Sequence, residues 1–224
     1  MTRGHQFHAR RRGDSPGRDA LYIAARAPRP GFTKTRLGRR IGHDDAAALA
    51  AAFLRDLASR FAEAPYTVGW YVTPDDAWRQ LGPLVATPDL DPRRDVLGQG
   101  SGDWTQRQRA LFQGARHRGE GRTVLIASDS PHLERHVVED AFARLRSCDL
   151  VLGPTDDGGY YLIGMRGAPQ EGGAAPWDVL TGVRMSTGTV LDELLARSRS
   201  LGLTTSTLPS TFDVDEAEDL DRLI

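Results

Sequence analysis

Residues 122–131 read Arg-Thr-Val-Leu-Ile-Ala-Ser-Asp-Ser-Pro. The continuous apolar run predicts a strand buried on both faces, because a strand with one wet face alternates apolar and polar residues. Ser130-Pro131 predicts the start of a helix running to Arg146, since proline is favoured at the first helical position. A buried strand followed directly by a helix is the repeating unit of a parallel α/β sheet.

The rest of the chain continues this alternation. Further strands are expected over residues 20–26, 66–72, 149–153, 160–165 and 203–208. Helices are expected over 44–62, 103–117, 187–201 and 215–223, with a short helix after Pro74 and an irregular stretch over 82–95. Strands alternating with helices predict a three-layer α/β/α fold around a mostly parallel, mixed sheet. One domain is expected over 19–224, after a disordered leader over 1–18.

Composition excludes several classes of protein. The chain has 224 residues and is 39% hydrophobic, enough for a sizeable core, and no apolar run is long enough to span a membrane. One cysteine, Cys148, without a secretory signal indicates a protein of the reducing cytoplasm. Residues 1–18 hold five arginines and one acid, so the remainder is net negative. General nucleic-acid binding is therefore not expected.

The sequence contains a single lysine. Of 29 basic side chains, only Lys34 is not arginine, and asparagine is absent altogether. Such a bias indicates that arginine is used wherever a generic positive charge is enough. A lysine ammonium is a compact charge that a guanidinium does not reproduce, so Lys34 is a candidate functional residue. The alternative is that it survives by chance.

A basic loop follows the first strand. Residues 26–37 read Arg-Ala-Pro-Arg-Pro-Gly-Phe-Thr-Lys-Thr-Arg-Leu and bring four cations together. Clustered cations and free backbone N–H groups after a strand favour phosphate binding. The loop is not a Walker A motif, which needs G-x-x-x-x-G-K-[S/T]. The alternative is a solvated, arginine-rich surface loop.

Asp129 follows the buried strand, where ligands of open α/β sheets bind. A carboxylate there commonly holds a divalent cation that bridges phosphate oxygens. Asp129 could instead cap the following helix, and His132 is more often a first-turn helix residue than a ligand. Asp213 and Asp215, near the C-terminus, can supply a second set of ligands for the same cation, although Asp215 with Glu218 also fits a capping box.

Three glycine-containing segments differ in what they indicate. In Pro154-Thr-Asp-Asp-Gly-Gly-Tyr160, Gly158 and Gly159 allow a ligand to lie against bare backbone, with Asp157 accepting from hydroxyls, or they form a plain turn. Gly98-x-Gly100-x-Gly102 has the wrong spacing for a dinucleotide fingerprint, and we interpret it as a loop that can touch a nucleotide. No G-x-S-x-G elbow is present, which argues against a Ser/His/Asp hydrolase.

The order of these motifs resembles one family. A-P-R-P-G-x-x-K-T-R-L, S-D-S-P-H-L, D-D-G-G-Y-Y-L-I-G and D-V-D-x-x-E-D-L follow one another along residues 20–224. They resemble the GT-A-fold, glycosyltransferase-like family related to 2-phospholactate guanylyltransferase. Its superfamily of nucleotide-diphospho-sugar transferases includes the molybdenum-cofactor guanylyltransferases.

This resemblance implies roles for individual residues. Lys34, Arg36 and Asp129 would be catalytic, with metal at Asp129, Asp215 and Asp213. The nucleotide would be bound by Ala25, Arg26, Gly31, Lys34, Gln99, Gly100, Asp103, Arg107 and Ser128. The acceptor would lie at Asp157, Gly158, Gly159, Trp177 and Ser186.

Two reactions are compatible with the resemblance. In nucleotidyl transfer, an acceptor phosphate or hydroxyl attacks the α-phosphate of a nucleoside triphosphate with Mg²⁺ or Mn²⁺ bound. In glycosyl transfer, a nucleotide-sugar is the donor. The basic loop and the lone Asp129, in place of Asp-x-Asp, favour nucleotidyl transfer. A non-catalytic nucleotide-binding protein is the third reading. The expected partners are a nucleotide donor and a small-molecule acceptor, and a homodimer is compatible with the sequence.

Overall fold

The computed structural model describes residues 17–167, 173–185 and 187–223, so the predicted leader lies almost entirely outside the described residues. The strands are β1 (Arg18–Arg26), β2 (Thr67–Thr73), β3 (Val96–Gly98), β4 (Glu120–Ala127), β5 (Leu150–Pro154), β6 (Tyr160–Arg166) and β7 (Thr205–Thr207). The α-helices are α1 (Thr35–Ile41), α2 (His43–Phe61), α3 (Trp78–Val85), α4 (Pro92–Asp95), α5 (Trp104–His117), α6 (Arg135–Arg144), α7 (Val190–Ser200) and α8 (Ala217–Leu220). Two 3₁₀ turns complete the chain, η1 (Pro176–Leu180) and η2 (Asp221–Leu223).

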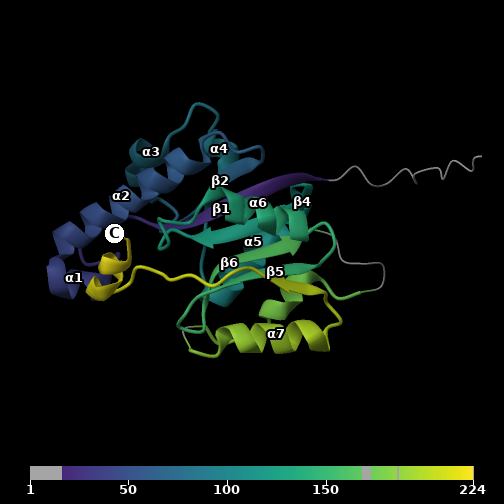
Figure 1. Cartoon of the computed structure of the whole chain (residues 1–224). Helices are drawn as coiled ribbons and strands as arrows, with labels where there is room; N and C mark the ends of the chain where they lie inside the picture. Colours follow the sequence, from purple (N-terminus) through teal and green to yellow (C-terminus); the bar gives the residue numbers. More distant parts are fainter. Residues whose placement is uncertain (1–16, 168–172, 186, 224) are drawn as a thin grey trace, which may run out of the picture.

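The seven strands form one mixed sheet in the order β3-β2-β1-β4-β6-β5-β7 (Figure 1). β3, β2, β1 and β4 run parallel, and β6 is antiparallel to both of its neighbours, β4 and β5. The carboxyl ends of β1, β2, β3, β4 and β5 therefore meet at one edge of the sheet. This is the edge at which open α/β sheets bind their ligands.

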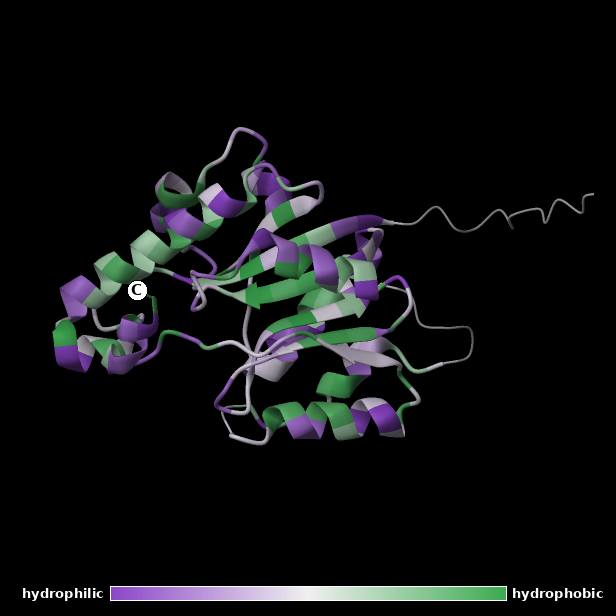
Figure 2. Ribbon diagram, viewed as in Figure 1, coloured by the Kyte–Doolittle hydropathy of each residue, from purple (hydrophilic) through white to green (hydrophobic). Residues whose placement is uncertain are grey.

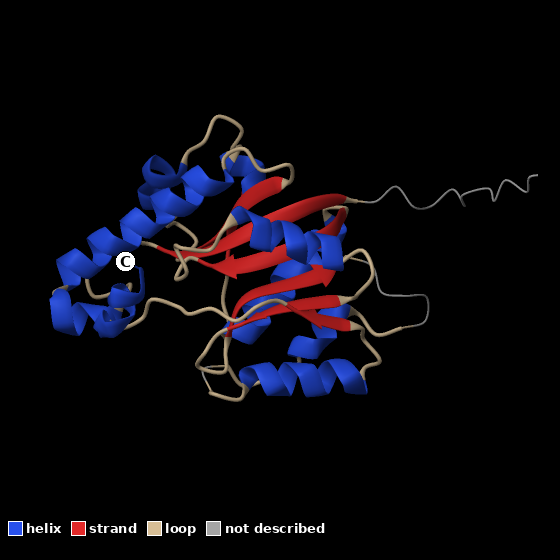
Figure 3. Ribbon diagram, in the orientation of Figure 1, coloured by secondary structure: helices blue, strands red, loops and turns tan. Residues whose placement is uncertain are grey.

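Helices cover both faces of the sheet (Figure 3). On one face, alternate residues of the strands, such as Leu21, Ile23 and Val124, pack against α2, α3 and α6. On the other face, the intervening residues, such as Tyr22 and Leu125, pack against α5, η1 and α7. The strands are accordingly the most hydrophobic part of the molecule in Figure 2. The predicted three-layer α/β/α fold with a mixed sheet is confirmed.

Several boundaries differ from the sequence prediction. β1 begins at Arg18, two residues early, and α3 and α4 occupy much of the stretch expected to be irregular over 82–95. α1, β3 and η1 were not expected, because each is short and carries little periodicity. The helix expected from Ser130 begins only at Arg135. The Ser130 hydroxyl does not cap that helix; it donates to Asp213, 2.6 Å away.

The last part of the chain crosses the edge of the sheet at which the carboxyl ends of β1 to β5 meet. Residues 208–215, here called the crossing segment, leave β7 and run past the end of β5 toward the end of β4. Backbone hydrogen bonds mark the route, from Leu208 N to Leu152 O, from Thr211 N to Pro154 O and from Val214 N to Asp129 O. Figure 1 shows this yellow segment leading to α8, which packs beside α1.

Candidate functional site at the carboxyl edge of the sheet

Asp129 and Asp215 are brought together by the crossing segment. Asp129 follows β4, and its carbonyl accepts a 2.9 Å hydrogen bond from the amide of Val214. This backbone contact places Asp215, the next residue, beside Asp129. About half of each carboxylate side chain is exposed, 44% for Asp129 and 52% for Asp215. The two carboxylates predicted as metal ligands therefore face solvent at one point of the sheet edge.

The Lys34 ammonium lies between these two carboxylates. Its Nζ is 2.5 Å from Asp129 Oδ1 and 3.2 Å from Asp215 Oδ1, and it donates to the carbonyl of Val214 at 2.6 Å. Only 4% of the lysine side chain is exposed. Burial alone would lower the pKa of Lys34, but the attraction of the two carboxylates outweighs it and the net pKa is raised. Lys34 is thus a buried, charged link between three segments.

Lys34 also has an unusual backbone conformation. Its φ of 47° is left-handed, the one positive φ among non-glycine residues in the described part of the chain. Lys34 precedes the first residue of α1, where its carbonyl accepts from Gly38 N. Non-glycine residues in this region are strained and are concentrated at functional sites. The turn into α1 therefore directs the lysine inward, toward the carboxylates.

Asp213, the third predicted ligand, is engaged differently. Its Oδ1 accepts a hydrogen bond from the Ser130 hydroxyl at 2.6 Å. Burial raises the pKa of Asp213 to about 6, and the nearby charges of Asp129 and Asp215 act in the same direction. Asp213 therefore fixes the crossing segment to the turn after β4, behind the two more exposed carboxylates.

The capping interpretation of Asp215 is wrong by one residue. The capping box of α8 is formed by Glu216 and Asp219, not by Asp215 and Glu218. The amide of Asp215 donates to the Asp219 carboxylate at 2.9 Å. The Asp215 side chain is therefore available to Lys34.

The basic loop after β1 lies next to this site. Arg26 and Arg36 are exposed, and Arg29 is held by Gln80 Oε1 at 2.8 Å. Gly31, with a φ of 72°, forms the turn, and a Cβ added there would meet nothing within 4 Å. A hollow of about 350 Å³ between α1 and α8 is lined by Arg36, Arg39, Arg40, Glu216, Ala217 and Glu218. Of the four predicted cations, Arg26 and Arg36 are therefore open to solvent, whereas Lys34 is buried against carboxylates.

The predicted nucleoside-binding residues form a second cluster at the ends of β2 and β3. Gln99 donates through Nε2 to Tyr71 O at 2.8 Å, and Arg107 donates to Gln99 Oε1 at 3.3 Å. The Gly100 amide donates to Asp75 at 2.9 Å. Asp103 forms a capping box with Gln106, so α5 begins at Trp104, next to the expected start of this helix.

Two further predicted nucleotide-binding residues lie where β1 and β4 end side by side. Ala25 is buried in β1 and follows Ala24, whose carbonyl accepts from the Ser128 amide at 3.1 Å. Both residues thus lie between the Lys34 loop and the Gln99 cluster. Ala25 and Ser128 therefore form part of this edge of the sheet through their backbone atoms.

The predicted acceptor residues do not lie together in the structure. The Asp157 carboxylate accepts from Thr155 Oγ1 at 2.6 Å and from Gly159 N at 3.0 Å, so it stabilises its own turn. A Cβ on Gly158 would collide with the carbonyl of Gly188. This turn follows β5 and therefore lies at the same edge of the sheet, where the carboxyl ends of β1 to β5 meet. Trp177, in contrast, is 9% exposed and packs in the core between α5 and α7. Ser186 lies outside the described residues.

A stack of three side chains beside the site was not predicted. The His132 imidazole lies on the Phe212 ring, with centroids 4.2 Å apart, and the Arg222 guanidinium lies 3.9 Å from the same ring. His132 Nε2 contacts Thr211 Oγ1 at 2.9 Å. Burial, followed by the charges of Arg60 and Arg222, lowers the pKa of His132. Sequence spacing gives no signal for this stack, because its members are brought together by the crossing segment.

The residues at the edge fit a divalent cation only in part. Among the residues that the structure describes, no three His, Cys, Asp or Glu side chains converge closely enough to hold a metal ion by themselves. Mg²⁺, however, is usually bound by one or two carboxylates together with substrate phosphates. Asp129 and Asp215 are two such carboxylates: each side chain is about half exposed, and the Oδ1 atom of each lies against the same Lys34 ammonium.

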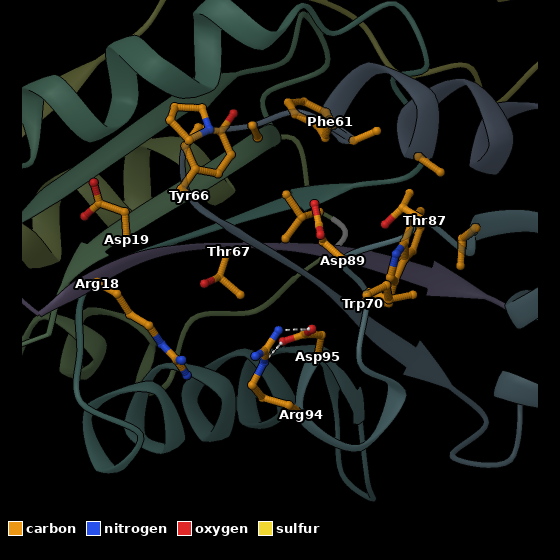
Figure 4. Close-up of a pocket in the computed structure, with 17 residues that line it drawn as sticks. Arg18, Asp19, Phe61, Tyr66, Thr67, Trp70, Thr87, Asp89, Arg94 and Asp95 are labelled. Carbon is orange, nitrogen blue, oxygen red and sulfur yellow. Dashed lines mark hydrogen bonds and ion pairs between the residues drawn. The ribbon is translucent and has the colours of Figure 1, made fainter.

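A cavity at the opposite edge of the sheet has a different character. It has a volume of about 540 Å³ and lies where β1 and β2 begin, between the end of α2 and the stretch from α3 to α4 (Figure 4). Its buried Asp95 is held by Arg94 at 2.7 and 2.8 Å, and Asp19 by Arg122 at 2.7 and 2.9 Å. These carboxylates are satisfied within the protein, and they lie far from the carboxyl ends of the strands. The cavity is therefore not part of the candidate site.

Comparison with known families agrees with this architecture. A family model described as "Uncharacterized protein conserved in bacteria (DUF2064)" matches residues 62–187, more than half of the chain. The chain belongs to the DUF2064 family. The matched region contains Asp129 and the Gln99 cluster, whereas Lys34 and Asp215 lie outside it. No curated protein matches the sequence.

Solved structures place this DUF2064 protein in the nucleotide-diphospho-sugar transferase superfamily of folds. A "putative nucleotide-diphospho-sugar transferase" from Desulfovibrio desulfuricans G20 matches with a TM-score of 0.79 and 29% identity, over 92% of this chain and 85% of that one. A CMP:2-keto-3-deoxy-manno-octonic acid synthetase complexed with CTP has a TM-score of 0.53 and 11% identity, over 92% and 96%. Rv0371c from Mycobacterium tuberculosis H37Rv, in complex with manganese, has a TM-score of 0.50 and 13% identity, over 92% and 97%.

In the described part of this DUF2064 protein, no helix combines the length and the apolar character needed to cross a membrane.

Proposed function

We propose that this protein is a metal-dependent nucleotidyltransferase. It would move a nucleoside monophosphate from a nucleoside triphosphate to a small phosphorylated or hydroxylated acceptor, with release of pyrophosphate. The observation that carries the proposal is the meeting of the Asp129 and Asp215 carboxylates at the sheet edge, beside a loop rich in exposed arginine. Carboxylates with neighbouring cations are the groups that phosphoryl-type transfer requires.

In this reaction the protein would form no covalent bond to the substrates; it would position them and stabilise the charge that develops on the phosphates. An acceptor oxygen forms a bond to the α-phosphorus, and the bond from that phosphorus to the bridging oxygen breaks, so negative charge accumulates on pyrophosphate. Asp129 and Asp215 would hold a divalent cation, Mg²⁺ or Mn²⁺, which supplies positive charge against the phosphate oxygens. Arg36 and Lys34 would stabilise the leaving pyrophosphate.

The nucleoside would lie along the same edge, over the ends of β1, β2 and β3. Arg107 donates to Gln99 there, Gly100 follows Gln99 and donates to Asp75, and Ala25, Arg26, Gly31 and Ser128 belong to the ends of β1 and β4 and to the loop before Lys34. The acceptor would approach the turn of Asp157, Gly158 and Gly159, which follows β5 at this edge. We leave Trp177 out of the acceptor site because its ring is packed in the core. The CTP complex of a protein with the same fold supports a triphosphate donor.

Glycosyl transfer from a nucleotide-sugar is the second candidate. The name of the structure with 29% identity favours it. A nucleotide-sugar carries two phosphates, whereas the loop and the start of α1 present Arg26 and Arg36 to solvent in addition to Lys34 beneath them. This excess of cations favours the more highly charged triphosphate. A non-catalytic nucleotide-binding protein is the third reading, and the meeting of both carboxylates with Lys34 argues against it.

A ligand screen separates these three functions. Thermal unfolding would be measured with all four nucleoside triphosphates and with nucleotide-sugars, each with and without Mg²⁺. All four bases are needed because the sequence resembles guanylyltransferases, while the structural neighbour is bound to CTP. A ligand present at about 100 times its Kd stabilises the folded state by about 2.7 kcal/mol.

The product then identifies the reaction. Pyrophosphate release from the stabilising triphosphate, in the presence of candidate acceptors and Mg²⁺, supports nucleotidyl transfer. Release of a nucleoside diphosphate from a nucleotide-sugar supports glycosyl transfer instead. Nucleotide binding that is independent of Mg²⁺ and unchanged by Asp129→Asn would contradict both enzymatic functions.

A further inference from the structure

The Lys34 ammonium uses the carboxylate oxygens that a metal ion would need. Its Nζ contacts Oδ1 of both Asp129 and Asp215, at 2.5 and 3.2 Å. A divalent cation binds carboxylate oxygens at about 2.0–2.6 Å. A cation that bonded the same two oxygens would lie against the ammonium, and two positive charges at such a separation repel strongly. The metal and Lys34 therefore compete for the same ligands.

The charges around this point still favour a cation. Three carboxylates share this part of the structure with the single ammonium: Asp129 and Asp215 contact it, and Asp213 is held nearby through its hydrogen bond from Ser130. Asp129 and Asp215 are about half exposed, so an ion can approach them from solvent, whereas Lys34 reaches them from the protein side. A doubly charged ion that replaces the ammonium would leave the cluster closer to neutral. Displacement of Lys34 is thus electrostatically reasonable once the ammonium has another partner.

We propose that Lys34 is an internal counter-ion that blocks the metal position until nucleotide arrives, and that the metal enters together with the nucleotide phosphates. In the protein without nucleotide, Lys34 neutralises part of the acidic cluster and weakens its affinity for free metal ions. When a metal–nucleotide complex binds, the ammonium leaves the two Oδ1 atoms and pairs with phosphate oxygens. This inference rests on the proposed function and adds to it what Lys34 does before nucleotide binds.

The local structure suits such an exchange. Lysine is a compact charge on a flexible four-carbon stem, so its ammonium can change partners while the backbone stays in place. The backbone of Lys34 is fixed in the left-handed turn before α1, and Gly31 precedes that turn. The neighbouring Arg36 is exposed at the start of α1. Phosphates drawn to these cations would lie within reach of the released ammonium.

Binding of free Mn²⁺ tests the proposal without any turnover. Mn²⁺ affinity would be measured by electron paramagnetic resonance for the unaltered protein, Lys34→Met and Arg39→Met, first without and then with a non-hydrolysable triphosphate analogue. Methionine is likewise unbranched, one atom shorter than lysine, and uncharged. Arg39→Met removes the same charge from exposed α1 without touching either carboxylate. Circular dichroism would check the folding of each variant.

The proposal predicts that Lys34→Met binds free Mn²⁺ at least about tenfold more tightly than the unaltered protein, whereas Arg39→Met changes it by less than about threefold. It also predicts that the analogue tightens Mn²⁺ binding to the unaltered protein more than to Lys34→Met, because only the unaltered protein has an ammonium for the nucleotide to draw away from the carboxylates. Equal or weaker Mn²⁺ binding by Lys34→Met would overturn the inference, while nucleotide-dependent Mn²⁺ binding by the unaltered protein would still support the proposed function. Absence of Mn²⁺ binding in every sample would overturn both.

The single lysine allows a second test on the unaltered protein. Labelling with [¹⁵N-ζ]lysine gives one side-chain signal in nuclear magnetic resonance, since Lys34 is the only lysine in the sequence. The proposal predicts that this signal shifts when Mg²⁺ and the triphosphate analogue are added together, and that it shifts much less with Mg²⁺ alone. An unchanged signal in a sample whose nucleotide site is saturated would contradict the exchange of partners. This measurement holds even if Lys34→Met does not fold.

Discussion

Lys34 and Asp215, 181 positions apart in the sequence, meet through an ammonium–carboxylate contact of 3.2 Å. The contact joins the loop after the first strand to the segment that follows the last. Asp129 completes it from the middle of the chain, so three distant motifs form one charged centre. The functional proposals depend on this centre, and the first two predictions below test it.

Asp129→Asn should abolish metal-dependent nucleotide binding while leaving the fold intact. The amide has nearly the same shape but loses the negative charge that attracts both a cation and Lys34, and about 44% of the Asp129 side chain is already exposed. We expect the melting temperature without ligand to change by only a few degrees and the Mg²⁺-dependent thermal shift to disappear. Asp56→Asn, an exposed change on α2, is the control. Full Mg²⁺-dependent stabilisation of a folded Asp129→Asn protein would refute the assignment.

Lys34→Arg should impair turnover although the charge is kept. The lysine side chain is 4% exposed, its ammonium is shared between two carboxylates and a carbonyl, and a planar guanidinium needs a wider, forked site. By analogy with the loss of one transition-state donor, kcat should fall by roughly 10²–10³-fold with a smaller change in KM. Steady-state kinetics on the reaction identified by the screen would measure this.

A matched control for that prediction is Arg55→Lys, the reverse change at an exposed position of α2. It should leave both kinetic constants unchanged. If Lys34→Arg matches the unaltered protein in kcat and KM, then the lone lysine reflects only the arginine-rich composition, and its functional role is wrong.

Gly158→Ala should destabilise the protein by about 2–4 kcal/mol. Gly158 has a φ of 85°, and an added Cβ would strike the backbone carbonyl of Gly188, which cannot rotate away. Steric overlap with backbone is therefore added to the usual cost of a left-handed alanine. Gly182→Ala is the matched control, because its φ is 78° and its Cβ would meet nothing within 4 Å. Urea unfolding should show a loss of about 1 kcal/mol for the control; equal losses would contradict the close approach.

Asp149→Asn should destabilise the protein by about 2–4 kcal/mol at pH 7, because it breaks a buried charged hydrogen-bond group. The carboxylate accepts from Thr204 N at 2.9 Å, from Thr204 Oγ1 at 2.6 Å and from Arg166 at 2.5 Å. Burial opposes ionisation, but these donors outweigh it and lower the pKa of Asp149. Chemical denaturation at a series of pH values would measure the difference.

The lowered pKa fixes the direction of the pH dependence. The stability that ionised Asp149 contributes is fully present above its unfolded-state pKa, near 3.8, and is lost as the pH falls through the lower folded-state pKa. The difference between the unaltered protein and Asp149→Asn should therefore be constant above about pH 5 and shrink in acid. Asp140→Asn, in an exposed pair with Arg144, should cost less than about 1 kcal/mol. A difference that grows in acid would contradict this account.

The regular elements of this fold could be predicted from the sequence because they depend on local pattern. The continuous apolar run of β4 specifies a strand buried on both faces, and the four-residue spacing of Phe53, Leu57 and Phe61 specifies the helix α2 and the face that it buries. The capping box of Asp103 and Gln106 likewise fixed the start of α5 within a few residues. The same local reasoning failed at Ser130, whose hydroxyl is bonded to a residue 83 positions later.

The sequence by itself determined the fold class and the acidic and basic residues at the ends of strands, and it singled out the one lysine as a candidate. Only the tertiary structure decided which of these residues meet. The crossing segment carries Asp213 and Asp215 back to Asp129, and it turns Lys34 from an expected phosphate contact into the partner of two carboxylates. Packing likewise removed Trp177 from the site. Spacing along the chain cannot report such contacts, because they depend on where backbone hydrogen bonds between distant segments hold the chain.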